Sequence, residues 1–197
     1  MNDLDPTGEG DATVFRDVLM LTLLGFVTIV VLLLPHLNPP AAKESARPAG
    51  NVVVEARWGD GLQSDVDLWV MGPGDRPVGY SRKNGVAFDL LRDDLGLSRD
   101  LTNLNYEFAF SHGAPAGEYI VNLHLFRLGN DPPPITVSVV ISLRNAATGA
   151  LTKITSRQVT LRREGEEVTV QRFRLDAHGA LVSGSLNQLQ RHLRNLG

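Results

Sequence analysis

The sequence of 197 residues contains no cysteine. A disulfide-stapled scaffold, thiolate catalysis and any zinc or iron–sulfur site with cysteine ligands are therefore excluded. Neither sign of charge dominates, because 19 Lys and Arg residues stand against 22 Asp and Glu residues, for a net charge of −3. Since nucleic-acid-binding domains are typically basic, this balance argues against nucleic acid as a partner. With 43% hydrophobic and 21% charged residues, the chain as a whole is not expected to be disordered.

Charge is absent altogether from one stretch, Val18–Leu34, which reads VLMLTLLGFVTIVVLLL. As a helix these 17 residues would span roughly 26 Å, slightly less than a hydrocarbon core of about 30 Å. Pro35 and the prolines after it are not expected to continue a helix, whereas the residues before the run can. We therefore predict a helix over 13–34, with Asp17 about one turn inside it.

Three interpretations of this helix compete. The run is apolar on every face, which argues against a core helix of a soluble protein. The residues before it are acidic rather than basic, and no clear cleavage site of small residues follows, which argues against a cleaved signal peptide. An uncleaved transmembrane helix in a lipid bilayer is favoured, and an exported soluble module is the alternative. Arg16 on one side and Lys43 and Arg47 on the other weakly favour a cytoplasmic C-terminus.

Charge is also distributed unevenly along the chain. Residues 1–17 carry five acids and one base, residues 35–50 carry a net charge of +1, and the rest are neutral in sum. This division predicts an acidic tail at 1–12, a transmembrane helix at 13–34, a linker at 35–50 and a globular domain at 51–197. The linker contains four prolines and is predicted to be a semi-extended spacer.

The residues after the linker have the pattern of short β-strands. Alternating or β-branched segments separated by turn residues occur at 51–58, 65–71, 106–111, 117–128, 135–144, 151–161 and 166–175. Such strands without intervening helices predict a mainly-β antiparallel sandwich or barrel. The predicted fold is thus one N-terminal transmembrane α-helix and an antiparallel β-sandwich. Helical spacing predicts that a short C-terminal amphipathic helix follows, carrying Leu186, Leu189, Leu193 and Leu196.

Acidic side chains are the candidate ligands of this domain. Asp65 and Asp67 lie two positions apart and so share one face of a strand. The other acids considered for the same site are Asp89, Asp93, Asp94 and Glu107. Because calcium prefers carboxylate oxygens, the sequence offers a calcium site on Asp65 and Asp67. The alternative is a pair of solvated acids. The histidines and serines show no zinc-binding or hydrolase spacing, so the chain is not expected to be an enzyme and no other cofactor is predicted.

The segment FRDVLMLTLLGFVTIVVLLLPHLNPP resembles the single transmembrane helix of the ExbD/TolR and MotB group, which are small subunits of ion-driven membrane motors. In that group an aspartate stands directly before an apolar run and a proline ends the run. Asp17 and Pro35 hold those places here, and the resemblance covers about residues 13–40. It implies a homodimer inside a ring of five multi-pass subunits of the ExbB/TolQ/MotA type, with Asp17 binding and releasing the translocated proton.

The same resemblance implies a bacterial inner-membrane protein whose C-terminal domain engages a target in the periplasm. No OmpA-type peptidoglycan-binding motif is present, so that target stays unnamed. The strings DVDLWVMGPGDRPVGYSRKNG and APAGEYIVNLHLF resemble secreted bacterial β-sandwich modules that bind carbohydrate or protein without catalysis. The alternative to a motor is therefore a passive, membrane-anchored binding module. In that case Asp17 is a helix-terminal residue in the headgroups, favoured by the helix dipole.

Overall fold

The computed structural model describes residues 7–37, 50–94, 104–145 and 147–196. The chain divides into two compact units, residues 1–47 and residues 48–197. Most of the predicted acidic tail and linker, at residues 1–6 and 38–49, lies outside the described residues.

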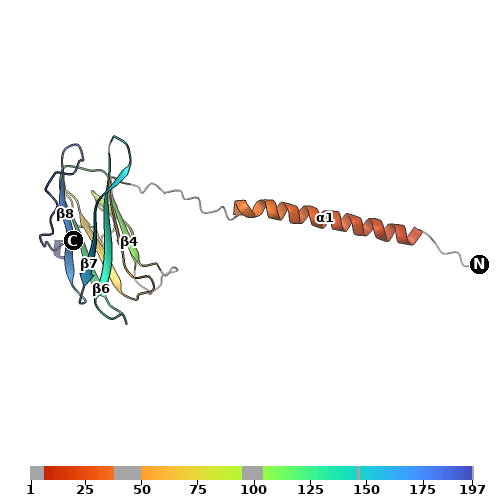
Figure 1. The fold of residues 1–197 in the computed structure, drawn as a ribbon, viewed down its shortest axis with the longest axis horizontal. Helices are drawn as coiled ribbons and strands as arrows, with labels where there is room; N and C mark the ends of the chain where they lie inside the picture. The colour runs from red at the N-terminus through yellow and green to blue at the C-terminus, as the bar shows by residue number, and fades with distance from the viewer. Residues whose placement is uncertain (1–6, 38–49, 95–103, 146, 197) are drawn as a thin grey trace, which may run out of the picture. The chain divides into compact units, whose positions relative to one another are not determined.

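The first unit is built on one continuous helix, α1 (Thr7–Leu37), shown in Figure 1. It begins six residues before the predicted start at Thr13 and ends three residues after the predicted end at Leu34. The expectation that Pro35 ends the helix was wrong. A proline removes a single N–H donor, and near a helix end that loss leaves the remaining bonds of the last turn in place.

Within α1 the stretch Thr13–Leu33 is long and apolar enough to cross a membrane. Every side chain in this stretch is exposed. Membrane-spanning helices and signal sequences share this length and composition, so both remain possible roles of the helix.

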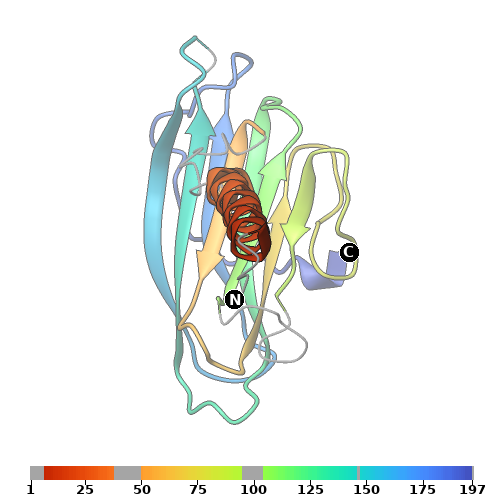
Figure 2. The same cartoon turned by 90° about the vertical axis from the view of Figure 1, so that its right-hand side faces the viewer.

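The described residues of the second unit form eight strands in two antiparallel sheets (Figures 1 and 2). The strands are β1 (Val52–Arg57), β2 (Asp65–Met71), β3 (Phe88–Arg92), β4 (Tyr106–Ser111), β5 (Gly117–Arg127), β6 (Ile135–Arg144), β7 (Leu151–Leu161) and β8 (Glu167–Leu175). One sheet has the order β3-β4-β1-β6-β7 and the other β2-β5-β8. The predicted mainly-β antiparallel domain is confirmed, and β3 is a strand that the sequence pattern did not indicate.

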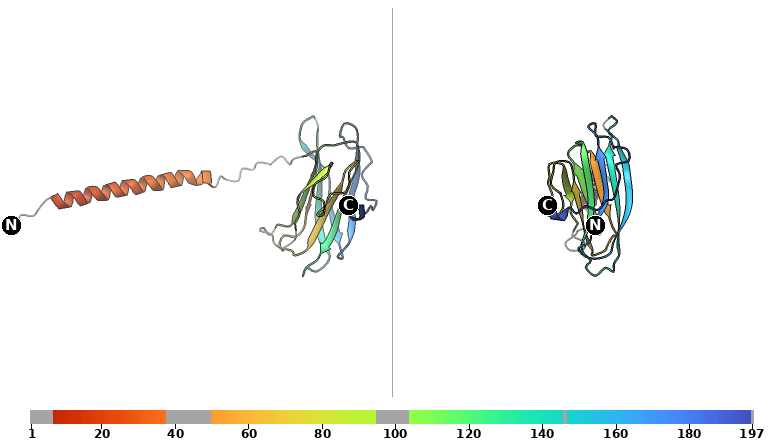
Figure 3. Two further views of the ribbon diagram at one scale, coloured as in Figure 1. Left: turned by 180° about the vertical axis from the view of Figure 1, so that it is seen from behind. Right: turned by 90° about the vertical axis from the view of Figure 1, so that its left-hand side faces the viewer.

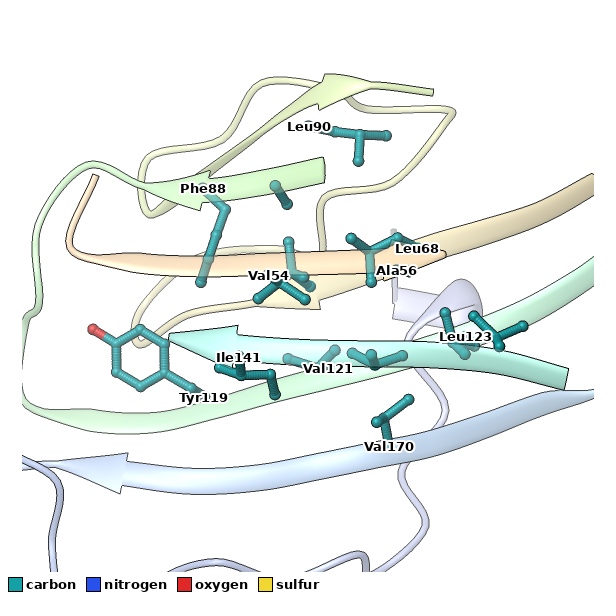
Figure 4. Packing of buried hydrophobic residues seen from close by; sticks show 14 of the residues in the cluster. Val54, Ala56, Leu68, Phe88, Leu90, Tyr119, Val121, Leu123, Ile141 and Val170 are labelled. Atoms are coloured by element: carbon teal, nitrogen blue, oxygen red, sulfur yellow. The ribbon is translucent and has the colours of Figure 1, made fainter. Parts of the chain in front are cut away.

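The core lies between the two sheets and is made by alternating residues of both (Figure 4). Val54 of β1 and Ile141 of β6 come from the five-stranded sheet. Leu68 of β2 and Leu123 of β5 come from the three-stranded sheet, and all four side chains are fully buried. Burying one such side chain contributes roughly 1.5–3 kcal/mol to stability. The buried side chains of both sheets together therefore hold the two sheets against each other.

The C-terminal leucines do not form the predicted amphipathic helix. The only helical turn among the described residues after β8 is a 3-10 turn, Arg194–Leu196. The segment before it pairs with the sheet instead, because Asn187 and Arg172 exchange two backbone hydrogen bonds of 3.0 and 2.8 Å. Leu193 alone is buried, whereas Leu189 is 68% exposed. Backbone pairing to β8 thus outcompeted a helix that the leucine spacing had indicated.

The fragment 48–197 is expected to be soluble and to give a far-UV circular dichroism spectrum dominated by β-structure, because its core is built from its own strands. In this fragment Leu123→Ala should lower the free energy of unfolding by about 2–5 kcal/mol in denaturant titrations. Leu189→Ala is the matched control and should change it by less than about 0.5 kcal/mol. A helix-dominated spectrum, or equal effects of the two substitutions, would contradict this account of the fold.

Candidate metal centre

A buried carboxylate lies where β4 approaches the edge strand β2. Glu107 of β4 faces the interior and is completely buried. Its Oε2 accepts a hydrogen bond of 2.5 Å from the backbone N–H of Leu68, and its Oε1 accepts one of 3.3 Å from the N–H of Asp94. Among the described strands only β5 pairs with β2 in the sheet. Glu107 therefore accepts a hydrogen bond from a backbone N–H of β2 that this pairing does not satisfy.

Two further carboxylates meet Glu107 at this edge. One oxygen each of Asp67, Asp93 and Glu107 lies within 4.8 Å of the other two. Asp67 comes from the middle of β2, and Asp93 directly follows β3. The three side chains are thus brought together by three segments that are separated in sequence, and each of them is more than nine-tenths buried.

Two of these three acids, Asp67 and Asp93, have basic partners. Asp67 Oδ2 lies 2.7 Å from His124 Nδ1, and Asp93 Oδ2 lies 2.9 Å from the ammonium of Lys83, whose side chain is half exposed. Asp93 Oδ1 is buried and has no hydrogen-bond partner among the described residues. Since nearly all buried polar atoms are paired, an unpaired carboxylate oxygen in a carboxylate cluster indicates an available ligand position.

Of the predicted pair Asp65 and Asp67, only Asp67 belongs to this group. The register between β2 and β5 shifts between Asp65 and Val66, and Asp65 Oδ2 faces Arg127 at 3.6 Å. Asp65 thus lies outside the group of three carboxylates, and a site shared by Asp65 and Asp67 stays a prediction. The Oδ1 of Asp65 is also buried and unpaired within the described part of the chain.

Of the other acids considered in the sequence, two belong to the carboxylate group and two do not. Asp93 and Glu107 join the group, whereas Asp89 contacts His112 at 2.9 Å and lies outside it. Asp94 binds the guanidinium of Arg92 at 3.0 Å and the backbone N–H of Tyr106 at 3.1 Å, which fixes the chain directly after Asp93. Asp94 therefore supports the site without being part of the triad.

Burial changes the acidity of the cluster. Burial, followed by the nearby charge of Asp67, raises the pKa of Asp65 to about 7 against the opposing charge of Arg127. Burial, followed by the charge of Asp67, also raises the pKa of Glu107 well above its usual value, against the hydrogen bond from Leu68. The mutual repulsion of carboxylates packed in this way favours a shared proton or a bound cation.

The donor set favours a hard cation. Three carboxylate oxygens supply part of the six to eight oxygen ligands that calcium takes, and water or carbonyl oxygens complete such shells. Zinc sites are built from nitrogen and sulfur ligands, and the one histidine beside the group, His124, uses its Nδ1 on Asp67. The three carboxylates thus form a group that could hold a metal ion, and their oxygen ligands are of the type that calcium prefers.

Comparison of the chain with protein-family models, with curated proteins and with solved structures gave no match. The resemblance of residues 13–40 to the ExbD/TolR/MotB helices therefore stays a prediction, and the candidate site rests on its own geometry.

Asp17 lies in α1, ten residues after its first residue, Thr7. The helix dipole acts on charges within the first turn. The interpretation of Asp17 as a helix-terminal residue favoured by that dipole was therefore wrong, because the helix begins earlier than its apolar stretch. Asp17 is the sole acid of the apolar stretch Thr13–Leu33.

His124 is a residue that the sequence pattern did not single out. It stands directly across from Asp67 in the pairing of β2 with β5. Metal-binding motifs compare residues close in sequence, whereas this pair is 57 positions apart. The register of the two strands is the signal that reveals it.

Proposed function

We propose that the β domain binds a divalent cation of the calcium type at Asp67, Asp93 and Glu107, and that α1 anchors this module in a membrane. The observation that carries the proposal is the convergence of three buried carboxylates, one of which, Asp93, has an oxygen without a hydrogen-bond partner among the described residues. The exposed apolar stretch of α1 supports the anchor.

A cation at this position would link β2 of one sheet to β4 of the other and to the chain after β3. It would replace protons on buried carboxyls by a fixed positive charge, and it would hold the open edge of the sandwich together. This role is structural and ligand-binding rather than catalytic, which agrees with the binding-module interpretation of the sequence.

Isothermal titration of the full-length chain in detergent micelles with calcium chloride tests the proposal. We expect saturable binding, and an affinity at least about tenfold weaker in Asp67→Asn and Glu107→Gln, since each loses one charged ligand. Asp89→Asn is the matched control, because it removes an equal charge from β3 outside the triad, and it should bind like the wild type. Absence of binding by the wild-type chain, or equal binding by all variants, would refute the site.

A second candidate function rests on Asp17. We propose that α1 pairs with a second copy and with a multi-pass ExbB/TolQ/MotA-like partner in a bacterial inner membrane, with Asp17 carrying the translocated proton and the β domain in the periplasm. Support comes from a carboxylate within an apolar helix and beyond the reach of the helix dipole. Purification of the tagged chain from native membranes tests this: a stoichiometric multi-pass partner is expected, and elution of the chain without one would count against the motor.

A further inference from the structure

The C-terminal segment packs on the outer face of the three-stranded sheet, on the side away from the core (Figure 3). Leu193 is completely buried there against Trp69 of β2 and Ile120 of β5. Burial of a whole leucine side chain between two strands holds this short segment against the sheet.

Polar contacts fix the same segment along its length. The backbone N–H of Leu193 donates to Oε1 of Glu167 at 2.7 Å. The amide of Asn122 donates to the backbone oxygen of Arg191 at 2.7 Å. The residue that follows Leu193, Arg194, is therefore placed at a defined position above β5.

Arg194 reaches the proposed cation site through His124. Its Nη1 lies 2.7 Å from Nε2 of the buried His124 ring. A guanidinium group can only donate hydrogen bonds, so Nε2 accepts and carries no proton. The proton of the neutral ring then lies on Nδ1, which donates to Oδ2 of Asp67 at 2.7 Å. Arg194 thus selects the histidine tautomer that holds the Asp67 carboxylate.

We infer that the C-terminal turn is a positioning element of the cation site, which sets the orientation of Asp67 through Arg194 and His124. The inference rests on the proposed cation-binding function and deepens it. Groups that orient a metal ligand from outside typically change affinity by about 10- to 100-fold when they are removed. By linkage, a cation bound to Asp67 stabilises the docked C-terminal segment by the same factor.

Two arginines of this segment provide the test in the full-length chain in detergent micelles. Arg194→Met removes the donor to His124 and keeps the length of the side chain, and we expect calcium affinity to fall about tenfold in titration calorimetry. Arg191→Met is the matched control: its Nη1 binds Glu118 at 3.2 Å rather than His124, and its loss should change affinity less than about twofold.

A second substitution, at His124, distinguishes a specific effect of Arg194 through His124 from a general loosening of the C-terminal segment. His124→Asn retains an N–H donor near Asp67 and has no acceptor at the position of Nε2, where Arg194 donates. In the His124→Asn variant, Arg194→Met should have no further effect on calcium affinity, because the two residues act on Asp67 through the same series of hydrogen bonds. Hydrogen exchange gives the reciprocal readout: calcium should slow exchange of the Leu193 and Leu196 amides in the wild type and should do so less in Arg194→Met.

Each outcome decides the inference. A tenfold loss confined to Arg194→Met and abolished by His124→Asn supports it. Wild-type affinity in Arg194→Met overturns the relay and leaves the cation site standing. Equal losses in Arg194→Met and Arg191→Met also overturn it, since they indicate a general loosening of the segment. If the wild-type chain binds no calcium, the cation site and the relay fail together.

Discussion

Without calcium, the isolated domain 48–197 is expected to lose stability as the pH rises from about 5 to about 7.5. Burial raises the pKa of Asp65 from 3.8 to about 7, so in this window the folded chain holds a proton that the unfolded chain has released. Unfolding then releases a proton, and stability must fall as the pH rises. Asp65 alone accounts for about 2–3 kcal/mol over this range, measurable in guanidinium titrations at each pH.

Glu107 acts in the same direction, because its pKa is also raised by burial and by the charge of Asp67. Groups with a lowered pKa, such as Asp176 with its hydrogen bonds from Ala180 and His178, act in the opposite direction and only near and below pH 4. Saturating calcium should remove the loss at high pH, since a ligand at about 100 times its dissociation constant adds about 2.7 kcal/mol.

A substitution pair controls this prediction. Asp65→Asn removes one titrating carboxyl and should flatten the dependence on pH. Asp60→Asn, on the half-exposed Asp60 beside Arg57, should leave it unchanged. A domain that grows more stable between pH 5 and pH 7.5 in calcium-free buffer would show that the buried carboxyls are ionised and compensated by other means.

If Asp17 carries a translocated proton as proposed, Asp17→Asn is expected to abolish proton-driven work while the proposed membrane complex still assembles. Asparagine keeps the size and hydrogen-bonding shape of aspartate and removes only the titratable charge. No other ionisable side chain lies between Val18 and Leu34 to replace it. Proton uptake into proteoliposomes that contain the purified complex, followed with a pH-sensitive dye, measures the loss directly.

Two further variants sharpen the experiment on Asp17. Asp11→Asn is the matched control, because it removes an acid that precedes the apolar stretch, and it should leave proton uptake intact. Asp17→Glu restores the charge about one methylene farther out and should recover uptake partly or not at all. Normal uptake by Asp17→Asn at normal expression would end the motor interpretation and leave the anchored binding module.

The regular parts of the fold were accessible from sequence because they depend on local patterns. Alternation indicated β5 and β6 nearly to the residue, since their apolar positions repeat with the period of a strand. The strand β3 was missed because it is only five residues long and follows a segment with few alternating positions. Leu193 was predicted to lie in a helix because the leucine spacing has a helical period. The spacing does not reveal that the backbone of this segment can pair with the edge of β8 instead.

In β4, alternation left the buried face undecided. Phe108 and Phe110 are half-buried on the outer face, whereas Glu107 and Ala109 face the core. Hydrophobicity alone would have placed the two phenylalanines inside. The small Ala109 and the hydrogen bonds that Glu107 receives from β2 and from the chain after β3 allow the opposite orientation.

The sequence by itself determined the apolar helix, the absence of thiol chemistry, the antiparallel β domain and the acids from which a site can be made. These follow from composition and from periods of two and 3.6 residues, which are local properties. Only the tertiary structure decided that Asp67, Asp93 and Glu107 meet, that Asp65 and Asp89 do not, and that His124 and Arg194 stand behind Asp67. The physical reason is that strand register and sheet packing bring together side chains that are distant in sequence, and no local pattern encodes such a distance.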